Sequence, residues 1–181
     1  GLVFYDVLQQ PFGVYGLMFP DKEYNFFKRL PFDVAYNSKN VGIVELNHHT
    51  AGGRLRFSTT SKKVAIIASM HKVSKMSHFA LTGSAGFDLY VNGVYEGSFI
   101  PPFDMEQGYE SLISLSNNDK KEIEINLPLY SGVNQLWVGL DENAEVFPAK
   151  NYRDIPPIVY YGSSITQGGC ASRPGSSYQS I

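Results

Sequence analysis

The residues of this chain that could do covalent chemistry lie in the run Gly-Ser-Ser-Ile-Thr-Gln-Gly-Gly at positions 162–169. A serine hydroxyl becomes a useful nucleophile when a base takes its proton and donors stabilise the oxyanion that forms. A turn of small residues after a strand exposes such a hydroxyl and leaves backbone N–H groups free to face a substrate. We therefore predict that Ser164 is a catalytic nucleophile and that its backbone N–H is an oxyanion donor. The alternative is an ordinary structural turn.

The segments around this turn predict where a second fold begins. A proline-rich stretch, residues 148–157, has the character of a linker. It leads into the apolar run 158–161, which we predict to be a strand, and a helix is predicted to begin near Ser176. A buried strand, a small-residue turn and a helix are how an α/β domain starts. We therefore predict one domain over 1–150, followed over 151–181 by a linker and the incomplete start of an α/β hydrolase domain.

Residues 1–150 carry strand signals and no sustained helical period. The clearest is a hairpin, because Asn92-Gly93 joins two strand-like runs and suits the positive φ angles of a type I′ turn. Seven or eight short strands separated by turn residues predict a mainly β fold, an antiparallel β-sandwich or jelly roll. The other strand-like or apolar segments are residues 41–47, 54–58, 64–70, 122–127 and 133–140.

Composition argues against several classes of partner. The formal net charge of −2 gives no basic surface for nucleic acid or an anionic membrane. No apolar run approaches the roughly 20 residues that a membrane helix needs. The single cysteine, Cys170, allows no intramolecular disulfide and no cysteine metal cluster, and it favours a reducing compartment such as the cytoplasm while leaving localisation open. The adjacent His48 and His49 have no carboxylate cluster nearby. We expect neither a metal nor a cofactor.

Two separate motifs resemble one known family. Residues 162–168 are similar to the first conserved block of the SGNH (GDSL-like) hydrolases, Gly-Asp-Ser-Leu/Ile-Thr-x-Gly, with Ser163 in place of the aspartate and Ser164 at the nucleophile. A branch of that family has an amino-terminal domain marked by a Gly-x-Asp-Leu-Tyr motif, which residues 86–90 match in full. Three further segments also look like that domain, namely residues 46–57, 80–86 and 109–111.

The resemblance implies a β-sandwich followed by a flavodoxin-like serine hydrolase, an esterase or acyltransferase acting on acylated small molecules or carbohydrates. The family's later blocks supply further oxyanion donors and an Asp-x-x-His segment for the base. None of the four histidines here lies in such a segment. We therefore expect the chain to be inactive alone and to work with its own carboxyl-terminal hydrolase domain. We also expect residues 158–181 to be held by the sandwich, by a second copy in a homodimer, or by a separate chain.

Other candidate residues have two interpretations each. His49 and Arg54 flank a Gly-Gly loop and are candidates for the substrate cleft, with ordinary packing as the alternative. The residues of the Gly-x-Asp-Leu-Tyr motif are predicted to be structural. In this interpretation the glycine supplies a bulge or positive φ, the aspartate accepts backbone donors and the tyrosine places its hydroxyl at the rim. They are Gly86, Asp88, Leu89 and Tyr90.

A second function stays open at this stage. The sandwich could be an independent carbohydrate-binding module, because the chain has 12 Tyr and 12 Phe whose faces could stack on sugar rings. The alternative is that these aromatics fill the core. The short, stiff segment 152–157 favours a fixed interface over the flexible tether of an independent module.

Overall fold

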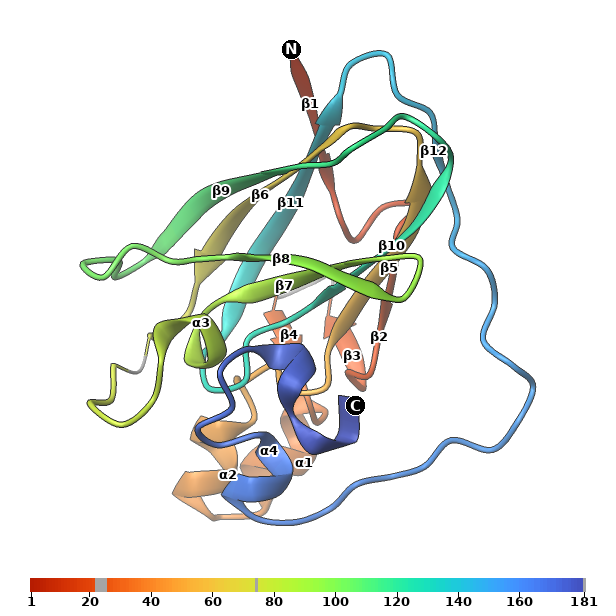
Figure 1. Ribbon diagram of the computed structural model, residues 1–181. Helices are drawn as coiled ribbons and strands as arrows, with labels where there is room; N and C mark the ends of the chain where they lie inside the picture. Colours follow the sequence, from red (N-terminus) through yellow and green to blue (C-terminus); the bar gives the residue numbers. More distant parts are fainter. Residues whose placement is uncertain (22–25, 74, 181) are drawn as a thin grey trace.

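The computed structural model describes residues 1–21, 26–73 and 75–180, and its main body is a β-sandwich of two antiparallel sheets (Figure 1). The four-stranded sheet has the order β1-β11-β6-β9, with bounds Leu2–Asp6, Val133–Asp141, Lys63–Met70 and Gly108–Ser114. The six-stranded sheet has the order β12-β5-β10-β7-β8, with bounds Val146–Phe147, Arg54–Thr59, Lys121–Asn126, Phe87–Val91 and Val94–Phe99, and β2 (Gly13–Tyr15) also pairs with β5. The predicted mainly β sandwich is confirmed.

The core lies between the sheets and follows the alternation of the sequence. Leu55 and Phe57 of β5 point inward with no exposed surface, and Ile123 and Ile125 of β10 lie beside them in register. The facing sheet contributes Val138 and its neighbours from β11 and β6. Each large apolar side chain buried in this way contributes about 1.5–3 kcal/mol, so burial on one face fixes the register of these strands.

The predicted hairpin is present. Asn92 has φ 51° and Gly93 has φ 82°, which are the left-handed conformations that a type I′ turn requires. This turn joins β7 to β8, and β8 ends at Phe99 just before the two prolines at 101 and 102.

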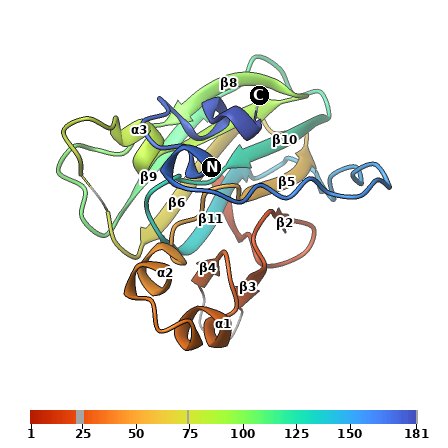
Figure 2. The same ribbon diagram turned by 90° about the horizontal axis from the view of Figure 1, so that it is seen from below.

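The apolar run 41–47 is not a strand, so this part of the β prediction is wrong. Residues Val41–Leu46 form helix α2, because the Asn40 side chain caps it by accepting from the N–H groups of Gly42 and Ile43. Helix α1 (Phe32–Asn37) precedes it, and both lie at one end of the sandwich near the hairpin of β3 (Phe19–Asp21) and β4 (Phe26–Lys28) (Figure 2). A third short helix, α3 (Leu81–Ser84), precedes β7. None of the helices in the described ranges is long and apolar enough to span a bilayer.

The strand predicted over 158–161 is also wrong for this structure. That segment has no regular secondary structure, and Ile158, Val159 and Tyr161 are 79%, 83% and 100% exposed. A strand needs a neighbour for its backbone hydrogen bonds, and here the segment arcs away from both sheets (Figure 1). The chain then returns to the sandwich as α4 (Ser164–Gln167) and two 3₁₀ turns, Pro174–Ser176 and Tyr178–Ser180, the first of which stands where a helix was predicted. Ile181 lies outside the described residues.

Candidate active site

Ser164 is the first residue of α4 and is exposed at its amino end. The Tyr130 hydroxyl donates to the carbonyl of Ser164 over 3.2 Å; burial raises the pKa of that phenol, and a side-chain hydrogen bond with Ser164 opposes the shift. Ser163 precedes Ser164 as the N-cap, and its side chain makes no capping hydrogen bond. Ser164 is therefore at the surface of the protein, beside the Tyr130 hydroxyl.

Two glycines shape this turn. A Cβ at Gly162 would lie 2.2 Å from Thr166 Oγ1, so a larger residue at 162 would force the Thr166 side chain to move. Gly168 ends α4 with φ 92°, a conformation that other residues adopt with strain. The N–H of Gly169 then donates to the carbonyl of Ser164 over 2.8 Å. These contacts explain the glycines of the run in local terms.

Gln167 joins α4 to the sandwich. It is the buried residue of the helix, 8% exposed, and its amide nitrogen donates to the carbonyl of Leu129 over 3.0 Å and meets His49 Nδ1 over 2.9 Å. Its amide oxygen accepts from Arg29 Nη2 over 3.3 Å. Sequence reasoning did not single out Gln167 or Arg29, because the partners lie more than a hundred residues apart along the chain.

His49, predicted to line the substrate cleft, lies beneath α4 and is 7% exposed. An amide nitrogen only donates, so Nδ1 of His49 must accept, and the imidazole is neutral with its proton on Nε2. Burial, together with the nearby Arg29 cation, lowers the pKa of His49 from 6.5 to about 4. The other charged or titratable groups around it are Glu45, His48 and Lys72, with the Tyr130 ring packed at 5.6 Å.

Acid is expected to destabilise the protein through His49. Between pH 6.5 and about 4 the unfolded imidazole binds a proton and the folded one does not, so the free energy of unfolding falls as the pH falls. One proton contributes a slope of at most about 1.4 kcal/mol per pH unit. His49→Asn keeps an acceptor in the place of Nδ1 and removes the titration, so its slope should be shallower. Urea unfolding at several pH values measures this, and equal slopes for both proteins would contradict it.

The aspartate of the Gly-x-Asp-Leu-Tyr motif holds the segment that follows α4. Asp88 is fully buried in β7, and its Oδ2 accepts from Arg173 Nη1 over 3.1 Å and from the Gly175 N–H over 2.7 Å. The Tyr90 hydroxyl accepts from Arg173 and donates to the carbonyl of Gly175. The guanidinium of Arg173 also lies 3.9 Å from the centre of the Tyr95 ring. We call these contacts the Asp88 clamp.

The other two residues of the motif shape β7 itself. Leu89 is fully buried in the sandwich core. A Cβ at Gly86 would lie 2.4 Å from the carbonyl oxygen of Thr82, so α3 and the start of β7 approach each other closely at that point. Gly86 is not among the residues with positive φ, so its role here is steric. Thr82 also donates its hydroxyl to the Ser172 carbonyl, which adds a contact between α3 and the tail.

Arg54 and the surface hollows lie apart from this arrangement. Arg54 begins β5 opposite Tyr15 and Asn126, and no contact in the described ranges joins its side chain to α4.

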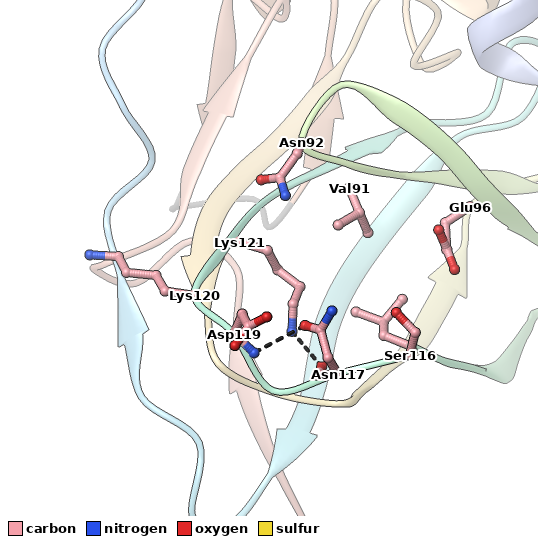
Figure 3. Close-up of a pocket in the computed structure, with 9 residues that line it drawn as sticks. Val91, Asn92, Glu96, Ser116, Asn117, Asp119, Lys120 and Lys121 are labelled. Carbon is pink, nitrogen blue, oxygen red and sulfur yellow. Dashed lines mark hydrogen bonds between the residues drawn. The ribbon is translucent and has the colours of Figure 1, made fainter.

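A hollow of about 120 Å³ lies between the β7–β8 hairpin and residues 115–121 (Figure 3). The Lys121 ammonium there already donates to the carbonyls of Asn117 and Ser61, so this hollow supports no ligand site. Among the described residues, no three His, Cys, Asp or Glu side chains are grouped to hold a metal.

The fold and the turn together define a β-sandwich that carries an exposed serine turn, bound to its surface by buried polar contacts. The chain belongs to the family GxDLY, described as the N-terminus of Esterase_SGNH_hydro-type, whose model matches residues 2–146. This confirms the resemblance seen in the sequence. The comparison with curated proteins found no match.

Solved structures share this fold. A protein described as a GDSL-like lipase from Bacteroides ovatus ATCC 8483 is 24% identical with a TM-score of 0.81, over 99% of this chain and 52% of that one. The salicylyl-acyltransferase SsfX3 from a tetracycline biosynthetic pathway is 19% identical with a TM-score of 0.79, over 99% of this chain and 50% of that one. The chain thus spans about half the length of both proteins. A CBM35 from Cellvibrio japonicus Abf62 has a TM-score of 0.45, covering 83% of this chain and 100% of that one at 9% identity, which is too low to support an argument.

Proposed function

We propose that the chain is the amino-terminal part of an SGNH-type esterase or acyltransferase in which Ser164 is the nucleophile. The observation that carries this proposal is that Ser164 is exposed at the start of α4, while Gln167 and residues 173–175 on the same segment are bound to the sandwich. In this proposal residues 1–150 form the accessory sandwich and 151–181 begin the hydrolase. The substrates are acylated small molecules or carbohydrates, a class suggested by the family.

The chemistry follows from the serine. Its Oγ attacks the ester carbonyl while a base takes the hydroxyl proton, and the resulting oxyanion accepts a hydrogen bond from the Ser164 N–H. Collapse of this intermediate breaks the ester bond, and the alcohol leaves with the proton. Water or an acceptor alcohol then takes the acyl group from the serine. In the described ranges His49 is bonded to Gln167, so the base and its orienting carboxylate are supplied by the carboxyl-terminal hydrolase domain.

The competing function is a carbohydrate-binding sandwich without a catalytic role. Its natural place is the groove of about 430 Å³ on the outer face of the six-stranded sheet, lined by Arg56, Tyr90, Glu124 and Ser180 among others. The buried contacts between the sandwich and α4 favour the first function, because an independent module has no need to hold a serine turn.

The proposal is tested by labelling the nucleophile of the full-length enzyme. A fluorophosphonate reacts with an activated serine and leaves a stable covalent adduct. Digestion and mass spectrometry are expected to place that adduct on Ser164, with loss of hydrolysis of short-chain p-nitrophenyl esters in proportion to labelling. An adduct on another serine, or ester hydrolysis that survives full labelling, would refute the assignment.

A further inference from the structure

The segment with the serine turn is attached to the sandwich at several points, and among them Gln167 is the buried side chain of helix α4 itself. Helix α4 has four residues, too few to be stable without outside contacts. Ser164 and Ile165 are exposed and Thr166 is half-buried, so Gln167 is the part of the helix that enters the protein. The orientation of the helix therefore depends on how firmly this amide is held.

The surroundings of Gln167 match the polarity of an amide. The amide nitrogen donates to two acceptors, the Leu129 carbonyl and His49 Nδ1. The amide oxygen accepts from one donor, Arg29. A hydrocarbon at this position would leave the Leu129 carbonyl and His49 Nδ1 without the hydrogen bond that a buried polar group needs, while Arg29 Nη2 would keep its bond to the Leu46 carbonyl. The three partners come from three distant parts of the chain, so the amide is fixed in three directions.

A second contact reaches Ser164 from the same place. The Tyr130 hydroxyl donates to the carbonyl of Ser164 over 3.2 Å, and burial raises the pKa of that phenol, which keeps it protonated as a donor. The Tyr130 ring packs against His49, the residue that accepts from Gln167. His49 thus lies between the two contacts that hold the helix at its two ends.

We propose that Gln167, held by His49 and Arg29, is a positioning residue that sets the place of the Ser164 hydroxyl for acyl transfer. The inference rests on the proposed function, because it assumes that Ser164 is the nucleophile. It makes the sandwich a working part of the active site. A displacement of a reacting group by about 1 Å costs about 100-fold in rate, which is the scale of effect expected when this amide is lost.

The experiment compares kcat and KM of three variants of the full-length enzyme on a p-nitrophenyl ester. Gln167→Met keeps the length and helix propensity and removes every hydrogen bond, so kcat is expected to fall about 100-fold with KM little changed. Gln167→Glu keeps the bond to Arg29 and lets His49 donate, but it loses the donor to the Leu129 carbonyl, so it should recover only part of the lost kcat. Gln135→Met makes the same change at an exposed position of β11 and should behave like wild type.

The outcomes separate this inference from the proposed function. Unchanged kcat in Gln167→Met, while Ser164→Ala is inactive, overturns the positioning role and leaves the nucleophile in place. A Gln167→Glu variant no more active than Gln167→Met also overturns it, because the hydrogen bonds would then not be the cause. Activity that survives Ser164→Ala overturns the proposed function itself. Unfolding temperatures measured in parallel give the range in which each variant is folded, and kcat is compared within that range.

Discussion

Replacing Ser164 with alanine in the full-length enzyme is expected to lower kcat/KM for ester hydrolysis on the order of 10⁴-fold or more. The serine oxygen forms the covalent bond to the acyl group, so without it the remaining oxyanion donors and substrate contacts give only a small residual rate. Folding should suffer little, because Ser164 is exposed and lies outside the sandwich core. Steady-state kinetics on short-chain p-nitrophenyl esters, with an unfolding curve for each protein, measure both effects.

The neighbouring serine provides the matched control. Ser163→Ala removes the same atom from the adjacent residue, which is equally exposed and whose side chain makes no capping bond to α4. This variant is expected to keep most of the wild-type rate. The reverse pattern, with activity lost in Ser163→Ala and kept in Ser164→Ala, would assign the nucleophile to the other serine of the pair and would contradict the family alignment.

The strands of the sandwich could be predicted because the pattern that defines each strand lies within a few consecutive residues. In β10 Ile123 and Ile125 alternate with polar residues and face the core, and in β11 Leu136, Val138 and Leu140 follow the same period, so the alternation predicts both the strand and its buried face. The Asn92-Gly93 turn is predictable for the same reason, since two adjacent residues decide its φ angles. Short strands such as β2 and β12 carry too few residues for a period to show.

The two wrong strands had apolar sequences without the partners that a strand needs. Residues 41–47 are apolar but lie outside the sandwich, and the Asn40 cap decides in favour of a helix. Residues 158–161 have the composition of a buried strand, yet no described strand lies beside them and their side chains face solvent. An apolar run predicts that other parts of the protein bury the segment. Whether it forms a strand depends on a neighbouring strand, which the rest of the fold must supply.

The motif of the candidate nucleophile is visible in the sequence, whereas the contacts that hold it are not. Ser164 stands in a short motif, whereas Gln167 and His49 are 118 residues apart and Arg173 and Asp88 are 85 residues apart. A single sequence gives no sign of such long-range pairs. One signal was present, because Asp88 is a charged residue within an apolar strand pattern, and a buried carboxylate requires a cationic or N–H partner.

Replacing Asp88 with alanine is expected to release the tail from the sandwich. The change leaves the Gly175 N–H and one side of the Arg173 guanidinium without their shared acceptor. Breaking a fully buried ion pair costs about 3–5 kcal/mol, and because the Arg173 side chain keeps 25% exposure to water we expect about 2–3 kcal/mol here. The amide of Gly175 should then exchange its hydrogen about 30–100 times faster, which hydrogen exchange followed by NMR can measure.

The variant Asp88→Asn removes the negative charge of the side chain and keeps its size and shape, so it tests the two contributions separately. The asparagine oxygen can still accept from the Gly175 N–H, while the attraction to Arg173 is lost, so exchange at Gly175 should lie between wild type and Asp88→Ala. The amides of Ile123 and Ile125, in the central strand of the same sheet, serve as internal references because their exchange reports the sandwich itself. If Gly175 and these amides accelerate together, the motif stabilises the sandwich as a whole. If Gly175 alone accelerates, the motif exists to hold the segment that carries the serine turn, and full-length Asp88→Ala should lose kcat as well.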